Sequence, residues 1–200
     1  MRDRVRIIGD ELLAKNWGSL RRYTLEFRRS TGEWQRQSRE VYDHGSAAAV
    51  LLHCPEKNTV ILVRQFRLPV YLDGRGGDLL EVCAGLLDGD PPETCARREA
   101  EEEAGIRVGA LRHAFDTYVS PGSVTEAIAC YVGTYDAAAR VSAGGGLEHE
   151  GEDIEVLELD FAEAIAMTRD GRISDAKTIM LLQYLALNPP EAGSGPRISS

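Results

Sequence analysis

The chain has 200 residues, of which 43% are hydrophobic and 28% charged, and its formal net charge is −9 at pH 7. This length fits one domain with a core of its own, and no apolar run approaches the roughly 20 residues that span a bilayer, which excludes a disordered or membrane-spanning chain. The excess of acids argues against general nucleic-acid binding, which depends on cationic patches.

The amino end, MRDRVRIIGDELLAKN, mixes both charge signs through its apolar residues and lacks the apolar core and cleavage site of a signal peptide. We therefore expect a cytoplasmic protein. The four cysteines, Cys54, Cys83, Cys95 and Cys130, are scattered without a C-x-x-C pair. This pattern predicts buried thiols rather than disulfides or zinc ligands.

The first third of the chain reads as strands. Residues 4–8, 20–28 and 33–42 are extended segments, and the turn residues 30–33 join the last two into a hairpin, which predicts a small N-terminal antiparallel sheet. Residues 47–52 and 59–66 are more apolar and are separated by the turn PEKN, which predicts a second, better buried hairpin.

A glycine-containing loop over 70–78 and a short apolar run over 79–83 lead into a helix. Asp90 can cap this helix, Pro91 suits its first position, and Glu93 stands three residues after the cap, as in a capping box. Gly105 offers the left-handed position that ends a helix, so we expect roughly four turns that end near Ala104.

This helix carries an unusual density of acids. Glu99, Glu102 and Glu103 stand at i, i+3 and i+4 and therefore share one face, where like charges destabilise a helix. A hard divalent cation such as Mg²⁺ or Mn²⁺ would relieve this repulsion, because such ions prefer oxygen ligands. The helix alone leaves open the alternative of an ordinary solvated acidic surface.

The rest of the chain alternates strands and helices. We expect strands over 107–114 and 127–134 with a turn-rich bridge over 118–123, a mobile glycine-rich acidic loop over 142–153, a strand over 154–159, helices over 161–169 and 175–187, and a frayed tail. Strands on both sides of a central helix predict an α/β/α sandwich around a mixed sheet.

Residues 98–106, REAEEEAGI, resemble the second half of the Nudix box, RE-U-x-EE-x-GU with U an apolar residue. Upstream, the spacing of that box places Asp90 in its glutamate slot and Ala84 in its glycine slot, and Gly85 is one residue off. The resemblance implies the same sandwich. We divide the chain into N-terminal strands that also serve as a dimerisation arm (1–45), a Nudix hydrolase domain (46–190) and a flexible tail (191–200).

Further stretches resemble the Nudix branch that cleaves nucleoside diphosphate sugars, and most closely the bacterial GDP-mannose pyrophosphatases. These stretches are REVYD at 39–43, VRQFR at 63–67, AGLLD at 84–88, YVSPGSVTE at 118–126, AGGG at 143–146 and DIEVLEL at 153–159. The resemblance implies Mg²⁺-dependent cleavage of GDP-mannose to GMP and mannose 1-phosphate. Residues 147–152 are longer by about two positions than the pattern of that branch.

The resemblance also implies roles for individual residues. Glu99 and Glu103 would bind Mg²⁺, or Mn²⁺, with help from Glu102 and the main-chain carbonyl of Ala84, and Arg98 would orient a glutamate. A glutamate on the acidic loop would activate the attacking water, and the candidates are Glu150 and, second, Glu152. The alternatives are a surface ion pair for Arg98 and a merely solvated run for the loop.

The predicted substrate contacts are spread along the chain. They are Arg64 and Arg67, whose guanidinium groups suit phosphate, Glu81 before the box, Glu126 at the end of the 118–126 motif, Lys177 on the last helix, and Arg39, Glu40 and Tyr42, which would reach the nucleobase from a second subunit. This set implies a homodimer with shared active sites and a nucleotide sugar as ligand. Cleavage of ADP-ribose and non-hydrolytic nucleotide sensing are the alternative functions.

Overall fold

The structure is a computed structural model that describes residues 2–189. The chain divides into two compact units. The strand unit comprises residues up to Ser46 together with Tyr118–Ala127, and the sandwich unit comprises Ala47–Thr117 and the chain from Ile128 onward. Each unit is described by itself below.

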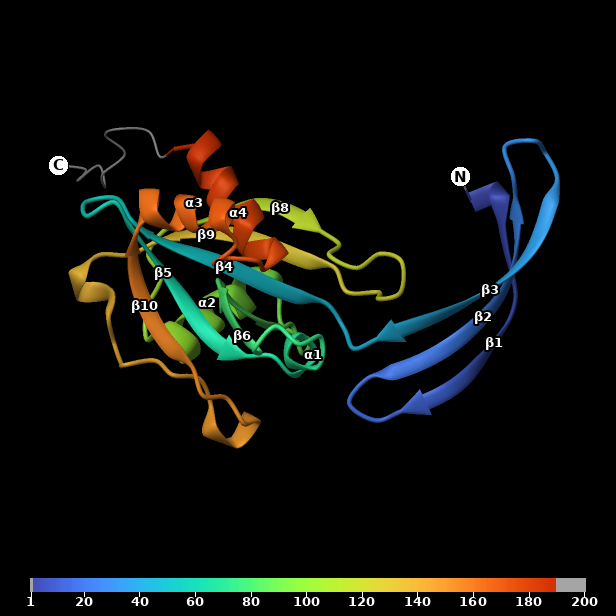
Figure 1. Cartoon of the computed structure of the whole chain (residues 1–200), viewed down its shortest axis with the longest axis horizontal. Coiled ribbons are helices and arrows are strands. Elements are labelled where there is room, and N and C mark those ends of the chain that lie inside the picture. Colours follow the sequence, from blue (N-terminus) through green and yellow to red (C-terminus); the bar gives the residue numbers. More distant parts are fainter. Residues whose placement is uncertain (1, 190–200) are drawn as a thin grey trace. The chain divides into compact units, whose positions relative to one another are not determined.

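The strand unit is a three-stranded antiparallel sheet in the order β1-β2-β3 (Figure 1). A short 3-10 turn, η1 (Arg2–Arg4), leads into β1 (Val5–Lys15), followed by β2 (Ser19–Arg28) and β3 (Trp34–Asp43). The expected first strand over 4–8 was too short. A register shift between Ile7 and Gly9 marks a β-bulge, which lets the chain continue pairing with β2 as far as Lys15.

The sandwich unit is built on a seven-stranded mixed sheet. Its strands are β4 (Ala47–Cys54), β5 (Thr59–Phe66), β6 (Asp78–Glu81), β7 (Cys83–Leu86), β8 (Leu111–Thr117), β9 (Ile128–Thr134) and β10 (Glu155–Asp160). The main order is β10-β5-β4-β9-β8, with β6 paired to β5 and β7 paired to β4. β4 and β9 run parallel, whereas the other pairs are antiparallel.

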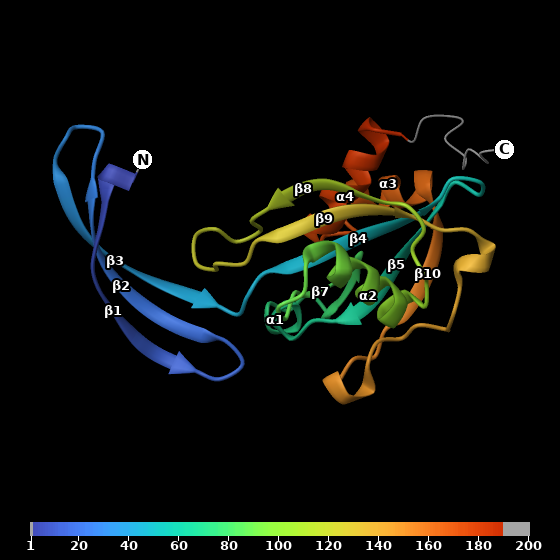
Figure 2. The ribbon, with the colours of Figure 1, turned by 180° about the vertical axis from the view of Figure 1, so that it is seen from behind.

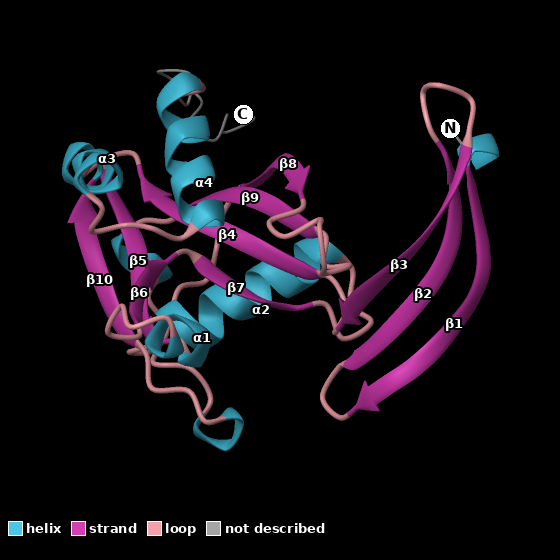
Figure 3. Cartoon of the chain, turned by 45° about the vertical axis from the view of Figure 1, so that its right-hand side comes forward, coloured by secondary structure: helices cyan, strands magenta, loops and turns pink. Residues whose placement is uncertain are grey.

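Helices cover both faces of this sheet. In Figure 2, α2 (Pro92–Ala104) lies across one face, and Figure 3 shows α3 (Phe161–Asp170) and α4 (Ala176–Leu187) beyond the other. Alternate residues of β4 serve the two faces: Leu51 packs in the cluster of α3 and α4, while Val50 and Leu52 pack in the cluster of α2. The predicted α/β/α fold with a small antiparallel N-terminal sheet is confirmed.

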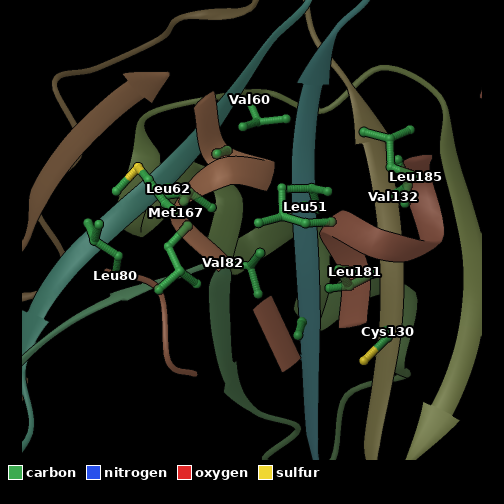
Figure 4. Close-up of a cluster of buried hydrophobic side chains, with 14 of the residues drawn as sticks. Leu51, Val60, Leu62, Leu80, Val82, Cys130, Val132, Met167, Leu181 and Leu185 are labelled. Atoms are coloured by element: carbon green, nitrogen blue, oxygen red, sulfur yellow. The ribbon is translucent and has the colours of Figure 1, made fainter. Parts of the chain in front are cut away.

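Figure 4 shows the first of these two cores, which β4, β5, β6 and β9 share with α3 and α4. Leu51, Leu181 and Cys130 are fully buried in it. All four cysteines of the chain are free and buried, as expected from their scattered positions. Within residues 2–189, no helix is long and apolar enough to cross a membrane.

The central helix ends as predicted but begins differently. Gly105 adopts the left-handed conformation at its C-terminal cap. At the other end the N-cap is Pro91 rather than Asp90, and among the described side chains none caps the first-turn amides of α2, so the predicted capping box is wrong. The Asp90 carboxylate instead lies 3.6 Å from the Arg98 guanidinium, which competes for the oxygen that a cap would need.

Three connecting regions also differ from expectation. The predicted loop over 70–78 overlaps a short helix, α1 (Leu68–Leu72), which Pro69 opens. The strand expected from 107 begins at Leu111, where the regular pairing with β9 starts. Before it, the Arg107 amide donates to the Ala139 carbonyl, and the Gly109 amide reaches only the carbonyl of Thr134 at the very end of β9. Two 3-10 turns, η2 (Ala137–Ala139) and η3 (Glu148–Glu150), lie in the stretch before β10. The predicted frayed tail lies outside the described residues.

Candidate active site

The carboxylates of α2 are held against the sheet. Glu99 and Glu103, one turn apart, are 7% and 2% exposed, and small buried residues such as Ala96 and Ala100 let the helix lie close to β7. Gly85 of β7 faces Glu99 directly: a Cβ at this position would lie 2.0 Å from Glu99 Oε1. Any larger residue at 85 would have to displace the Glu99 carboxylate, which occupies the space of a side chain.

Arg98 joins the acids of this face to one another. Its Nη1 lies 2.8 Å from Glu99 Oε1 and donates a hydrogen bond to Glu102 Oε2 at 3.1 Å, and its Nη2 donates to the carbonyl oxygen of Leu86 at 3.1 Å. The guanidinium thus bridges two acidic side chains and the end of β7. The orienting role of Arg98 stays a prediction, with which this geometry is compatible.

Glu103 is the most buried acid of the helix. Burial first, and then the neighbouring Glu99 carboxylate, raise the pKa of Glu103 to about 8, against the opposing effect of the Ala84 amide. That amide donates to Glu103 Oε2 at 3.1 Å, so Ala84 touches the site through its N–H. Two buried carboxylates that disfavour each other's charge would be stabilised by a cation.

The donor set of α2 fits a hard divalent cation, because it consists of carboxylate oxygens. In the described part of the chain, however, no group of three or more His, Cys, Asp or Glu side chains forms a ready-made metal cage. The Arg98 guanidinium forms ion pairs with both Glu99 and Glu102, so each of these two carboxylates has a cationic partner. A metal held by Glu99 and Glu103 would therefore share the site with an existing ion-pair network.

A second charged cluster contains Glu81, Arg67 and Lys177. Glu81, at the end of β6 and 3% exposed, accepts from Arg67 Nε at 2.6 Å and from Lys177 Nζ at 2.6 Å. Lys177 also donates to Asp175 at 3.1 Å. Burial alone would lower the pKa of Lys177, but Glu81 and Asp175 together raise it above its ordinary value, so the ammonium stays charged.

Three observations tie this cluster to the neighbouring elements. The charge of Arg67 is among the effects that lower the pKa of Glu103, so the guanidinium lies near the acids of α2. Asp175 caps α4 by accepting from the Thr178 amide at 3.0 Å, and the Thr178 hydroxyl in turn accepts from the Val82 amide at 2.8 Å. The start of α4 is thereby fixed to the junction of β6 and β7.

Arg64 lies apart from these groups. It pairs with Glu155 of β10 and lines an open pocket of about 410 Å³ whose wall includes Leu80 and Met167, residues of the core under α3 and α4. It therefore lies on the face of the sheet opposite to α2. The structure does not bring Arg64 together with the acids of the box.

The acidic loop, residues 147–153, contains both predicted bases, but the structure describes the side chain of only one of them. Glu152 Oε2 accepts from the Leu147 amide at 2.9 Å, and the Glu152 carboxylate is among the groups that raise the pKa of Glu103. Glu150 lies in η3, but its side chain is outside the described part of the structure. Of the two predicted bases, the structure therefore relates Glu152 to the acids of α2.

The remaining predicted contacts belong to the strand unit. Arg39 is exposed and donates to the Ser38 carbonyl at 2.8 Å, Glu40 pairs with Arg22 at 3.3 Å, and Glu126 is half-buried on the 118–127 segment. Tyr42 lies beside His44, with ring centroids 5.5 Å apart.

Two features of these sites were not predicted from the sequence. Trp17 stacks on His44 with ring centroids 5.0 Å apart and an interplanar angle of 16°, and it is 70% exposed, which extends the aromatic surface of Tyr42. Asp175, the first residue of the helix expected over 175–187, is also a partner of Lys177, which was not predicted. An exposed tryptophan in a tight turn, Asn16-Trp17-Gly18, was a signal available in the sequence.

Comparison with known families gives two adjacent matches. The GDP-mannose pyrophosphatase NudK N-terminal domain matches residues 4–42, and the NUDIX domain matches residues 43–182. The second match alone covers more than half of the chain. Together the two matches span both structural units.

Curated relatives are similar over nearly the whole chain. A GDP-mannose pyrophosphatase of Pectobacterium atrosepticum is 52% identical over 179 residues, which are 89% of this chain and 92% of the relative. One of Cronobacter sakazakii is 50% identical over 184 residues (92% and 95%), and one of Escherichia coli is 46% identical over 189 residues (94% and 98%).

Among solved structures, the crystal structure of an ADP compounds hydrolase superposes with a TM-score of 0.69 over 92% of this chain and 93% of that one. The sequence identity is 20%, so this likeness concerns the fold.

Proposed function

The chain belongs to the NUDIX domain family, and on this basis we propose that it is a metal-dependent hydrolase that cleaves the diphosphate of GDP-mannose into GMP and mannose 1-phosphate. The observation that carries the reaction type is the pair of buried, mutually repelling carboxylates Glu99 and Glu103 on α2. The choice of GDP-mannose rests on relatives of that name that are 46–52% identical over most of the chain.

In this proposal Glu99 and Glu103 hold the metal, Mg²⁺ or Mn²⁺, with Glu102 and the main chain of Ala84 nearby. When bound, the metal withdraws charge from the diphosphate oxygens, which otherwise repel a nucleophile. Arg98 keeps Glu99 and Glu102 in place through its two ion pairs. The acids alone would repel the substrate.

Two cationic side chains of the sandwich unit compensate the negative charge of the diphosphate. Arg67 and Lys177 are held side by side by Glu81, and Arg67 is close enough to Glu103 to lower its pKa. We assign these two side chains to the phosphates. Glu81 then contacts the substrate only through them, and Arg64 remains a weaker candidate because it lies on the other face.

A glutamate of the acidic loop accepts the proton of the attacking water. Glu150 is the first candidate and Glu152 the second, and each would have to come within hydrogen-bond reach of that water. Glu150→Gln should lower kcat with little change in metal affinity. If only Glu152→Gln has this effect, the base is Glu152.

The nucleobase contacts are assigned to the strand unit of a second subunit. Tyr42 offers a stacking face, Glu40 offers acceptors for a guanine edge, and Arg39 and Glu126 add polar groups. This assignment requires a homodimer, which light scattering tests directly. A monomer that keeps full activity would exclude recognition across subunits.

The decisive assay incubates the purified protein and Mg²⁺ separately with GDP-mannose, ADP-ribose and other nucleotide sugars. We expect the highest kcat/KM with GDP-mannose and no turnover after chelation of the metal. A higher kcat/KM with ADP-ribose would change the substrate, and tight nucleotide binding without any nucleoside monophosphate would indicate a sensor.

The matching variant is Glu103→Gln, which should lower kcat by roughly 10² because the metal loses a charged ligand. Normal activity in this variant would remove Glu103 from the site. Cytoplasmic residence and the absence of nucleic-acid binding remain predictions from the sequence.

A further inference from the structure

The run Ala143-Gly144-Gly145-Gly146 has no role in the proposed reaction, yet its three glycines lie against the last turn of α2. Gly145 donates its amide to the carbonyl of Glu103 at 2.9 Å, and Gly146 donates to the carbonyl of Glu102 at 3.2 Å. These carbonyls belong to Glu103, a predicted principal metal ligand, and to Glu102, which is predicted to assist it. Part of the stretch expected to be mobile is thus bonded to the helix.

The last four carbonyls of a helix lack partners within it. In α2 all four are satisfied: Glu101 by the Gly105 amide at 3.1 Å, Glu102 and Glu103 by the two glycines, and Ala104 by Arg140 Nη1 at 3.4 Å. Two of the four bonds therefore come from the glycine run. They also offset the negative end of the helix dipole beside carboxylates that already repel each other.

Backbone geometry at the run requires glycine. Gly144, Gly145 and Gly146 have φ of 72°, 115° and 78°, the left-handed region that side chains disfavour. A Cβ on Gly144 would lie 2.4 Å from the Glu103 carbonyl oxygen and 2.7 Å from the Ala104 carbonyl carbon. Both atoms are backbone and cannot move without shifting the helix.

The same run also fixes the two ends of the acidic loop. The Ile154 amide, directly before β10, donates to the Gly145 carbonyl at 3.2 Å, and the Leu147 amide donates to Glu152. Gly145 thus bonds to α2 through its N–H and to the far end of the loop through its C=O. The acidic loop therefore begins and ends beside the main chain of Glu103.

We propose that Gly144, Gly145 and Gly146 form a main-chain clamp that positions the Glu103 carboxylate relative to the glutamates of the acidic loop. The three glycines are positioning residues, since their own atoms need not touch substrate. The link to catalysis rests on the proposed function, whereas the clamp itself is a property of the folded chain.

The test compares Gly144→Ala with Gly171→Ala. Gly171 ends α3 with φ of 84° and has nothing within 4 Å of an added Cβ, so both variants carry left-handed strain but only Gly144→Ala displaces the clamp. We expect Gly144→Ala to lower kcat for GDP-mannose by about 10-fold to 100-fold, with KM within about 3-fold, because small displacements of catalytic groups are costly. Gly171→Ala should stay within about 2-fold of wild type, as a substitution remote from the site.

Hydrogen exchange on the substrate-free protein provides the second readout. The amides of Gly145 and Gly146 should be protected in wild type and in Gly171→Ala, and should lose protection in Gly144→Ala while amides of β4 and β9 keep theirs. Unprotected amides at Gly145 and Gly146 in wild type would overturn the clamp. Lost protection with kcat unchanged would overturn its role in positioning.

Should Gly144→Ala fail to fold, Gly146→Ala replaces it. Its φ of 78° strains the run, and its added Cβ would lie 2.5 Å from Glu152 Oε2 and 2.8 Å from Glu152 Cβ, but no helix backbone atom is among the nearest contacts. We expect partly lost protection at Gly145 and Gly146 and a kcat lowered by about 3-fold or more; lost protection with an unchanged kcat overturns the positioning role. If wild type cleaves no nucleotide sugar, the proposed function fails, and the exchange data still decide whether the clamp exists.

Discussion

All eight residues of β4 in the sandwich unit are buried, whereas no residue of β1, β2 or β3, all within the described part of the chain, is buried. The strand unit displays Val5, Ile7 and Leu12 at 42%, 60% and 47% exposure. Its visible stabilising contacts are ladder hydrogen bonds, surface ion pairs such as Arg22 with Glu11, and Arg6 stacked 4.0 Å from the Trp34 ring.

The difference in burial shows where the stability of each folded unit comes from. Burial of apolar surface contributes about 25 cal/mol per Å², while an exposed ion pair contributes at most about 1 kcal/mol. The sandwich unit therefore carries its own stability. The strand unit exposes apolar side chains that would be stabilised by burial. The second subunit that the proposed function requires would bury them.

The largest expected effect tests this contrast directly. Leu51→Ala, at a fully buried position, should lower the free energy of unfolding by about 2 to 5 kcal/mol, because it leaves a cavity in the core. Ile7→Ala in β1 should cost little in dilute solution and more as protein concentration rises. Denaturant titrations at two concentrations measure both, and an Ile7→Ala cost equal to that of Leu51→Ala in dilute solution would break the comparison.

Charge inside the sandwich unit should also be costly to disturb. Glu81→Gln should lower the free energy of unfolding by about 3 kcal/mol, because Lys177 and Arg67 lose a buried counter-ion and Lys177 retains only Asp175. Glu163→Gln is the control, since its exposed pair with Arg172 contributes little. Equal thermal shifts in the two variants would contradict a structural role for the Glu81 cluster.

A dependence on pH follows from Glu103 in metal-free protein. Below its ordinary pKa of 4.5 the carboxyl is protonated in both states, but between 4.5 and about 8 only the folded state keeps the proton. The free energy of unfolding should therefore fall as pH rises, by about 2 kcal/mol between pH 6 and 8 from this group. Glu103→Gln should flatten the slope in chelator; an unchanged slope would assign it to other groups.

Disturbing the strand unit should affect binding more than stability. Tyr42→Ala should raise KM for GDP-mannose by about 10-fold, which corresponds to the loss of one stacking contact. Trp34→Ala, at the opposite end of β3, is the control and should leave KM near the wild-type value. If both variants raise KM equally, the sheet acts as a whole and Tyr42 has no special role.

The smallest effect concerns the outer surface of α2. Glu93 and Arg97 form an exposed i,i+4 pair at 2.9 Å, so Glu93→Gln should change the free energy of unfolding by under about 0.5 kcal/mol and leave kcat unchanged. A large loss of activity would mean that the acidic site extends around the helix.

The elements of the sandwich unit were largely predictable, because local signals agree with tertiary packing there. Asp175 is a good cap and does cap α4, Gly105 ends α2, and the apolar runs of β4 and β5 are buried. Asp90 misled the prediction because Arg98 attracts its carboxylate. In the strand unit, Gly9 reads as a break, although pairing with β2 continues through a bulge.

For the site, helical spacing sufficed to group the acids of α2. The partnership of Glu81 with Lys177 spans 96 positions and has no local signature, so only the fold reveals it. Strand alternation could have shown that Arg64 lies on the face of Leu62, away from α2, since the two residues are two apart in β5.

The boundary between the two family matches, at residues 42 and 43, is not a boundary in space. Tyr42 donates its amide to the Ser123 carbonyl at 2.8 Å and accepts from the Thr125 amide at 3.1 Å, and the Thr125 hydroxyl donates to Asp43 at 2.7 Å. Residues 118–127, inside the NUDIX match, thus complete the strand unit. A recombinant chimera that joins two relatives at residue 42 would inherit the strands from one parent and their closing segment from the other, so the 118–127 segment must travel with the amino-terminal strands.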